Sequence, residues 1–237
     1  MSSRKKFNLI LDLDQTLISS VSPDEIKDAI KKDNNVKNRL KFKSYNMEDY
    51  YIVHERPNLQ SFLDYIFKNF NVSVWTAATK EYALFIIEKI LLKKKNRKLD
   101  YILFSYHCNV SKKHFNGSTK KLSMLCRHKE IKKNYNINNT FILDDNDEVY
   151  NSQKNNCLLA IPFECLHSDS HKDDFLEKVI KQLKKIKTNK GRLNLNDFNR
   201  EVTQLIKMNQ KETENIDTTD TTDTTDTTDT TDTTDTD

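Results

Sequence analysis

Glycine and proline are scarce in this chain of 237 residues, which holds two glycines and three prolines. Such a content excludes a chain built of glycine-rich or proline-rich low-complexity sequence, and it leaves a globular body rich in lysine, asparagine and isoleucine. No apolar run reaches the roughly 20 residues that cross a bilayer, and the N-terminus lacks the apolar region of a signal peptide. We therefore expect a soluble protein of the cytoplasm or nucleus with no membrane partner.

Cysteine is also too sparse for a disulfide framework. The four cysteines form no CxxC pair and show no framework spacing: Cys108, Cys126, Cys157 and Cys165. Reduced thiols are the expected state in a chain of this length and pattern. A zinc site at His107, Cys108 and His114 is the alternative, although their spacing matches no common zinc finger.

Negative charge is concentrated at the C-terminus. The formal charge of the whole chain is +4, and the eight aspartates from Asp217 to Asp237 carry −8, so the rest of the chain carries +12. The Asp-Thr-Thr repeat has no apolar residue to bury and predicts a disordered acidic tail. The basic body favours an acidic or phosphorylated partner and permits nucleic acid, or it is an ordinary lysine-rich surface. The basic run at residues 93–98 is a solvated helix end or a nuclear-import signal.

Apolar periodicity predicts alternating strands and helices. Strands are expected near residues 7–13, 72–75, 101–104, 107–110, 141–143 and 158–161, and helices near 58–70, 81–92, 122–133 and 173–186. A weaker amphipathic helix follows Gly191. This alternation predicts an α/β fold, with a parallel sheet covered by helices on both faces. We expect residues 1–188 to form this domain, 189–211 a linker with the short helix, and 212–237 the tail.

Three predicted strands end in polar side chains. Asp12 and Asp14 follow the first strand, Thr76 follows the second, and Asp144 and Asp145 follow a later one. Because ligands bind at the carboxyl ends of parallel strands, we expect these side chains to converge. Carboxylate and carbonyl oxygens suit Mg²⁺, which would also offset the repulsion between neighbouring carboxylates.

Four ordered segments resemble the motifs of the haloacid dehalogenase superfamily, and more narrowly its FCP/SCP-type, Nif-like phosphatases of the RNA polymerase II C-terminal domain. They are Leu11-Asp12-Leu13-Asp14-Gln15-Thr16-Leu17, Val74-Trp75-Thr76-Ala77, Lys120-Lys121-Leu122-Ser123 and Ile142-Leu143-Asp144-Asp145. The resemblance spans residues 6–185 and includes Glu55-Arg56-Pro57 and Lys80-Glu81-Tyr82-Ala83. It implies a Rossmann-like parallel sheet with a small β insertion after the second motif.

The resemblance also implies a role for each matching residue. Asp12 would be the nucleophile that forms an aspartyl-phosphate, and Asp14 would be the general acid and base. Mg²⁺ would be held by the Asp12 and Asp145 carboxylates and the Asp14 carbonyl, with Asp144 acting through water or as a support. Thr76 and Lys120 would bind the phosphate, although Lys121 is an alternative to Lys120. We expect the Thr16 hydroxyl to close the turn after the nucleophile.

Two departures from the family pattern concern the substrate. The family often carries an Arg-Glu-x-Cys segment, whereas this chain has Ser105-Tyr106-His107-Cys108. We therefore expect a basic contact to a second phosphate to be missing. Residues 18–50 lack the patterning of a large cap domain, which indicates a site open to a protein segment.

The sequence thus predicts a Mg²⁺-dependent serine/threonine phosphoprotein phosphatase, acting on the polymerase tail or another disordered phosphopeptide. Two alternatives stay open. One is a noncatalytic binding module on the same fold, and the other is a nucleic-acid end phosphatase.

Overall fold

The structure is a computed structural model that describes residues 6–188 and 195–217. The chain divides into two units, Met1–Val202 and Thr203–Asp237. The first contains every strand of the described residues, and the described part of the second is the remainder of helix α9 (Asn196–Asp217). The predicted domain boundaries remain a prediction, because residues 189–194 and 218–237 lie outside the described residues. Helix α9 does include residues 212–217, which we had assigned to the tail.

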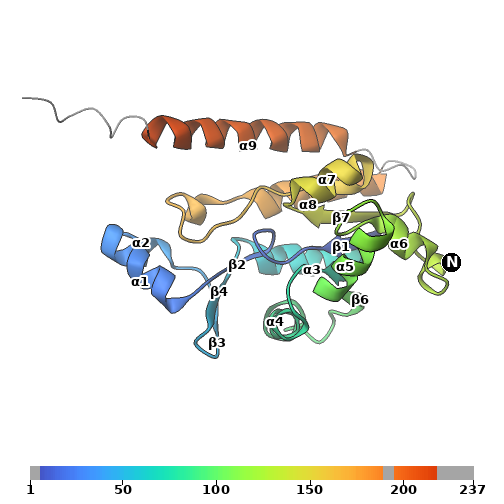
Figure 1. The fold of residues 1–237 in the computed structure, drawn as a ribbon, viewed down its shortest axis with the longest axis horizontal. Helices are drawn as coiled ribbons and strands as arrows, with labels where there is room; N and C mark the ends of the chain where they lie inside the picture. The colour runs from blue at the N-terminus through green and yellow to red at the C-terminus, as the bar shows by residue number, and fades with distance from the viewer. Residues whose placement is uncertain (1–5, 189–194, 218–237) are drawn as a thin grey trace, which may run out of the picture. The chain divides into compact units, whose positions relative to one another are not determined.

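A five-stranded parallel sheet forms the centre of the first unit (Figure 1). Its strands are β6 (Leu99–Leu103), β5 (Asn71–Trp75), β1 (Asn8–Leu11), β7 (Thr140–Asp144) and β8 (Cys157–Leu159), in that spatial order. Each pair of neighbours is parallel. All four residues of β1 are buried, as expected for a central strand covered on both faces. Chain order runs outward from β1 in both directions, so a topological switch point lies beside it.

Helices cover both faces of this sheet. On one face, side chains of α5 (Ser105–His114), α6 (Leu122–Arg127) and α7 (Asp147–Ser152) share a core with Ile10, Trp75 and Ile142. Alternation along the strands turns Leu9 and Val72 to the other face, where α3 (Leu59–Asn69) contacts β5 and α8 (Phe175–Thr188). Helix α4 (Lys80–Ile86) follows β5 and continues as a π-helical turn at Ile87–Leu91. The predicted α/β class, with flanking helices and no large cap, is confirmed.

A small antiparallel sheet interrupts the chain directly after β1. It consists of β2 (Ile18–Val21), β4 (Tyr51–Glu55) and β3 (Ser44–Met47), with β4 in the middle, and α1 (Pro23–Lys32) and α2 (Val36–Arg39) lie between β2 and β3. We had expected the small β insertion after the second motif, and that position was wrong. Strand β3 pairs on one side only and has no buried residue, and its alternation of Ser44 and Asn46 with Tyr45 and Met47 is too short to be a clear signal in the sequence.

Residues 107–110 are helical, so the strand expected there was wrong. They belong to α5, whose cap residue Phe104 donates its backbone N–H to Nδ1 of His107. Only Cys108 and Ser111 of α5 are buried, which leaves little helical periodicity to read. The helix expected over 122–133 ends at Arg127, and a 3₁₀ turn follows at Ile131–Lys133. Further 3₁₀ turns lie at Lys154–Asn156 and Ser170–Lys172.

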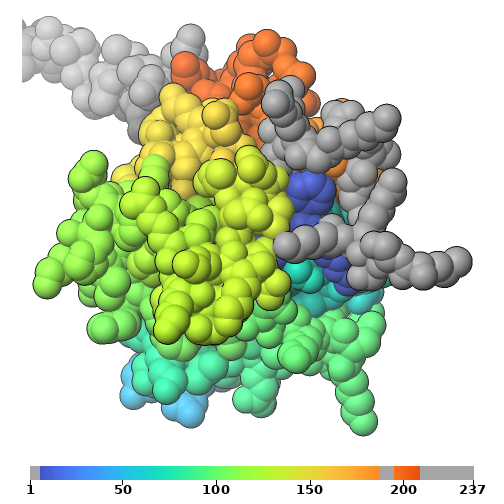
Figure 2. Space-filling view, turned by 90° about the vertical axis from the view of Figure 1, so that its right-hand side faces the viewer, coloured from blue at the N-terminus to red at the C-terminus, as the bar shows by residue number. Residues whose placement is uncertain are grey.

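The segment from β6 to the 3₁₀ turn at Ile131–Lys133 forms much of the face seen in the space-filling view, in green to yellow-green (Figure 2). Its exposed side chains include Lys112, Lys113, Lys129 and Lys132. These lysines account for part of the positive charge that the sequence places in the body of the protein. None of the helices described is long and apolar enough to cross a membrane.

Candidate active site

Asp12 lies where the buried central strand ends. Strand β1 carries it between β5 and β7, and its backbone N–H still donates to the carbonyl of Leu143 at 3.0 Å. The next residues leave the sheet in a tight turn, in which Gln15 has a φ of 55° and Leu17 N–H donates to Leu13 O at 2.8 Å. The Asp12 side chain is therefore fixed at the carboxyl edge of the sheet, and Asp12 is only 6% exposed.

Lys120 makes the closest charged contact to Asp12. Its Nζ lies 2.5 Å from Oδ1 of Asp12 and 2.8 Å from Oδ2 of Asp144. Burial alone would lower the pKa of Lys120, but the two neighbouring carboxylates raise the pKa well above its usual value. Lys120 therefore stays a cation at neutral pH.

The two lysines of the third motif point to different partners. Nζ of Lys121 contacts the backbone carbonyl of Ser152, away from the carboxylates. Gln153 holds the loop that carries them: its Nε2 donates to Lys120 O at 2.8 Å, and its Oε1 accepts from Leu122 N–H at 2.9 Å. No sequence pattern points to Gln153, since an isolated amide matches no motif.

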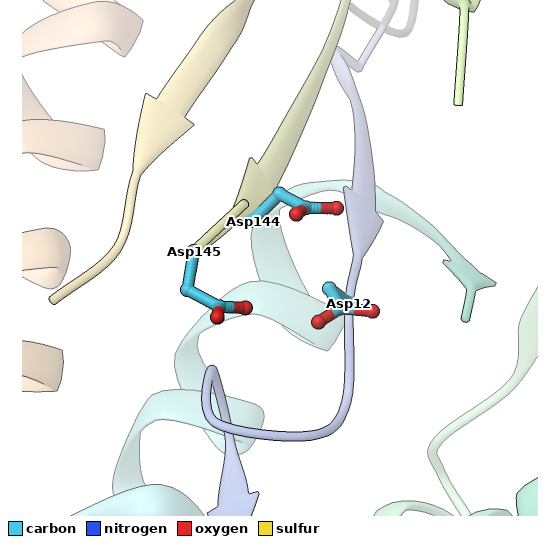
Figure 3. A group of neighbouring side chains, drawn as sticks. All are labelled: Asp12, Asp144 and Asp145. Atoms are coloured by element: carbon cyan, nitrogen blue, oxygen red, sulfur yellow. The ribbon is translucent and has the colours of Figure 1, made fainter. Parts of the chain in front are cut away.

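Three carboxylates converge between the ends of β1 and β7 (Figure 3). One oxygen each from Asp12, Asp144 and Asp145 lies within 4.8 Å of the others, and no other such group of three metal-binding side chains occurs in the described part of the chain. The Thr16 hydroxyl donates to Asp145 at 2.8 Å and lies 3.4 Å from Asp12. The contact with Asp12 spans the turn after β1, as expected, and the shorter bond to Asp145 ties this turn to the end of β7.

The donor set fits Mg²⁺, because carboxylate oxygens are hard ligands and these three are close enough to share one ion. Asp144 is the least free of them. It is fully buried, its Oδ2 binds Lys120, and its Oδ1 accepts from Asn146 N–H at 3.0 Å. Asp12 and Asp145 are therefore the better candidates for direct ligands, with Asp144 in a supporting position.

Burial and mutual repulsion affect the acidity of this cluster. Burial, followed by the charge of Asp12, raises the pKa of Asp145 to about 6. Burial also raises the pKa of Asp144, although the Lys120 ammonium opposes that change. Without a further cation, the folded protein thus resists full ionisation of these side chains, and a divalent ion would relieve that cost.

Asp14 lies apart from the three carboxylates and is bonded to a tyrosine. The hydroxyl of Tyr82, on α4, donates to Oδ1 of Asp14. Burial raises the pKa of Asp14 to about 6, the Tyr82 hydrogen bond opposes this, and the charge of Asp12 adds to it. A carboxyl group with a pKa near neutrality can both give and accept a proton under physiological conditions.

Thr76 directly follows β5, the strand beside β1. Its backbone N–H donates to Leu103 O at 3.0 Å, and its hydroxyl oxygen accepts from Ala78 N–H at the same distance. Among the described residues no acceptor is found for the hydroxyl hydrogen, so this hydrogen could be donated to a bound anion. The alternative zinc group does not form: the Cys108 thiol lies 3.5 Å from the Thr76 carbonyl, while His107 bonds to Phe104.

Known proteins share this sequence pattern over most of the chain. The sequence model of the family described as NLI interacting factor-like phosphatase matches residues 7–193. The chain belongs to this family. Its membership confirms the predicted relation to the FCP/SCP-type phosphatases of the haloacid dehalogenase superfamily.

Two viral proteins of this phosphatase family are similar along most of their length. The CTD phosphatase-like protein 355R of Invertebrate iridescent virus 6 is 45% identical over 176 residues, which cover 73% of this chain and 94% of the viral protein. Its counterpart in Invertebrate iridescent virus 3 is 39% identical over 192 residues, covering 79% and 100%.

A solved structure of Fcp1, an essential RNA polymerase II CTD phosphatase, has the same fold as this member of the family. The TM-score is 0.55 at 22% identity, and the match covers 77% of this chain and 62% of the Fcp1 chain. At this identity the likeness concerns the fold alone.

Proposed function

We propose that this phosphatase is a Mg²⁺-dependent phosphoprotein phosphatase that removes phosphate from serine or threonine through an aspartyl-phosphate on Asp12. The proposal rests chiefly on one observation, the convergence of Asp12, Asp144 and Asp145 at the edge of the sheet, where the buried Lys120 binds Asp12 and Asp144. The substrate is a phosphorylated, flexible protein segment, such as the C-terminal domain of RNA polymerase II. The absence of a large cap favours such a substrate over a small metabolite that needs enclosure.

In the first step, a carboxylate oxygen of Asp12 attacks phosphorus and the bond from phosphorus to the leaving oxygen breaks. Asp14 gives its proton to that oxygen, so the alcohol leaves neutral. Lys120 and Thr76 bind the phosphoryl oxygens, whose negative charge persists throughout the transfer. Two easier displacements thus replace one difficult reaction.

In the second step, Asp14 takes a proton from water as the water oxygen attacks phosphorus. The bond between phosphorus and Asp12 then breaks, which releases inorganic phosphate and restores the Asp12 carboxylate. Asp12, Asp145 and the backbone carbonyl of Asp14 would hold Mg²⁺, supported by Asp144. The ion would supply positive charge against the phosphoryl oxygens and the crowded carboxylates.

Hydrolysis of para-nitrophenyl phosphate and of a phosphoserine peptide tests this function. We expect both activities to require Mg²⁺, to disappear with a chelator, and to fall by more than about a thousandfold in Asp12→Asn. Asp24→Asn, an exposed aspartate in α1, is the matched control and should retain activity. Label from a ³²P-phosphopeptide should remain briefly on the wild-type protein and not on Asp12→Asn. Retained turnover in Asp12→Asn would exclude the nucleophile.

A third substrate tests the class of macromolecule. A 3′-phosphorylated oligonucleotide should be hydrolysed more slowly than the phosphopeptide at the same concentration. Faster hydrolysis of the oligonucleotide would instead identify a nucleic-acid end phosphatase. A wild-type protein that hydrolyses none of these esters, yet binds the phosphopeptide, would be a noncatalytic binding module.

A further inference from the structure

A row of hydroxyl groups leads to the side chain of Asp14. Tyr82 on α4 bonds to Oδ1 of Asp14, and the Ser20 hydroxyl on β2 lies 2.5 Å from the Tyr82 oxygen. These residues come from three segments: the turn after β1, the small antiparallel sheet, and the helix after the second motif. The contact thus joins the insertion to the residue that the proposed mechanism uses for proton transfer.

The direction of these hydrogen bonds follows from the number of protons. A tyrosine hydroxyl has one hydrogen, which Tyr82 donates to the ionised carboxylate of Asp14. Ser20 must then donate to the Tyr82 oxygen. Ser20 thus donates to Tyr82, and Tyr82 donates to Asp14. Each hydroxyl hydrogen is then hydrogen-bonded, and the carboxylate accepts from one fixed donor.

The ring of Tyr82 is also held in place. The ring of Tyr51 meets it edge to face, with centroids 5.8 Å apart and planes at 84°. Thr79 caps the helix that carries Tyr82, since its hydroxyl accepts from Tyr82 N–H at 3.4 Å. Tyr106, by contrast, is 70% exposed. The hydroxyl of Tyr82 therefore reaches Asp14 from a restrained ring rather than from a freely rotating surface side chain.

We propose that Tyr82, braced by Ser20, is a positioning residue that orients the carboxyl group of Asp14 for proton transfer to the leaving group. This inference rests on the proposed function. With Oδ1 bonded to Tyr82, Oδ2 is the oxygen that carries and delivers the proton. Loss of the Tyr82 hydroxyl would let the carboxyl group rotate, so fewer of its orientations would direct a proton at the departing oxygen.

The chemistry of the leaving group separates this role from a general effect on folding or binding. Para-nitrophenolate is stable enough to leave without a proton, whereas phenolate and alkoxides benefit increasingly from protonation. The value of kcat/KM reports the steps up to departure of this group. A series of substituted phenyl phosphates keeps the size of the substrate nearly constant while the basicity of the leaving oxygen changes.

The experiment compares Tyr82→Phe with wild type on this series in the presence of Mg²⁺. For phenyl phosphate we expect kcat/KM to fall by about tenfold or more, within the range of general acid catalysis, and for para-nitrophenyl phosphate by less than about threefold. Ser20→Ala should change the series in the same direction and by less. Tyr106→Phe removes a hydroxyl from an exposed tyrosine and should leave the whole series unchanged.

A double-variant comparison provides the second measurement. In an Asp14→Asn background, Tyr82→Phe should cause no further loss on phenyl phosphate, because the side chain it orients no longer transfers a proton. An equal loss on all esters, or no loss on phenyl phosphate, would overturn the role of Tyr82 while leaving the phosphatase function intact. A wild-type protein inactive on every ester would overturn the proposed function, and this inference with it.

Discussion

Nζ of Lys120 lies 2.5 Å from Oδ1 of Asp12, so the proposed nucleophile forms a buried ion pair. The two residues are 108 positions apart in the chain, and each is less than 10% exposed. The same ammonium group contacts Asp144 at 2.8 Å. One cation thus offsets two carboxylates, and in the proposed reaction the same cation would contact the phosphoryl oxygens.

Replacement of Lys120 should therefore affect catalysis much more than replacement of its neighbour. We expect Lys120→Met to lower kcat/KM for phosphate esters by about 10²–10³-fold, since a fixed donor to the transferring phosphoryl group is lost. Lys121→Met, whose ammonium contacts the Ser152 carbonyl, is the matched control and should stay within a few-fold of wild type. Steady-state kinetics on folded variants measure kcat/KM for both. A larger loss in Lys121→Met than in Lys120→Met would assign phosphate binding to Lys121.

Metal binding should appear as a change in stability that depends on Asp145. At pH 7.5 we expect Mg²⁺ at about 100 times its dissociation constant to stabilise the wild-type protein by about 2.7 kcal/mol. Asp145→Asn should lose most of this response, because it removes a charged ligand from the cluster. Thermal unfolding with increasing Mg²⁺ measures both effects. Asp147→Asn changes an exposed aspartate nearby and should keep the wild-type response.

The same variant should have the opposite effect without metal. Burial and Asp12 raise the pKa of Asp145 to about 6, above its ordinary value of 3.8. A raised carboxyl pKa in the folded protein stabilises the fold below pH 3.8, where the carboxyl group is protonated in both states. This stabilisation is lost as the pH rises through about 6. At pH 7.5 with chelator, Asp145→Asn should therefore unfold at a higher temperature than wild type. A lower unfolding temperature for Asp145→Asn than for wild type under these conditions would show that repulsion between Asp145 and Asp12 does not dominate.

The centre of the fold could be read from the sequence because its signals are local. An apolar run such as Leu9-Ile10-Leu11 is the pattern of a central parallel strand, and the change to Asp12 marks its end. Parallel strands then bring residues such as Asp12 and Asp144 to one edge of the sheet, wherever the intervening chain goes. The positions of these residues follow from strand order, while their chemical roles remain a prediction.

Other parts of the site depend on contacts that leave no local pattern. Ser20 and Tyr82 are 62 positions apart, and nothing in their own segments indicates that their hydroxyls meet. The Gln153 side chain holds the Lys120 loop by donating to Lys120 O and accepting from Leu122 N–H, and an isolated amide carries no periodicity or charge signal. The small sheet was misplaced for a similar reason, since β3 has only four residues, none of them buried, and is defined by its pairing with β4.

Arg56 provides a test of what holds the turn after the nucleophile. Its side chain is fully buried, and it donates to the carbonyls of Thr16 and Ile161 at 2.9 Å and to both carboxylate oxygens of Asp173. Its guanidinium also lies 4.4 Å from the centre of the Phe175 ring. Arg56→Met should lower the free energy of unfolding by about 3–5 kcal/mol, because it leaves a largely buried carboxylate unpaired.

Denaturant unfolding measures this loss, and Arg39→Met is its control. Arg39 also pairs with a carboxylate, at 2.7 Å, but Asp33 is 42% exposed and can be solvated after the change. We expect a much smaller loss in the control. Similar losses in the two variants would mean that Arg56 contributes no more than a surface ion pair.

His54 should make the protein sensitive to mild acid. It is 3% exposed, its ring lies 6.1 Å from that of Phe42, and neither ring nitrogen has a hydrogen-bond partner among the described residues. Burial lowers the pKa of His54, so the unfolded chain takes up a proton near pH 6.5 that the folded protein resists. The neutral, buried imidazole therefore contributes its full stability above about pH 6.5. As the pH falls below about 6.5, the free energy of unfolding declines by at most about 1.4 kcal/mol per pH unit.

His54→Phe keeps an aromatic ring against Phe42 and removes the titrating group, so it isolates this contribution from the carboxylates. The variant should gain stability relative to wild type as the pH is lowered from about 7.5 to about 5, as measured by urea unfolding at each pH. His114→Phe, at the exposed end of α5, is the control for exchanging an imidazole for a phenyl ring outside the core. The contrary outcome is a difference in unfolding free energy between His54→Phe and wild type that stays constant from about pH 7.5 to about pH 5. The buried imidazole would then be protonated at no extra cost inside the fold. A hydrogen-bond acceptor would have to approach the ring for that to happen.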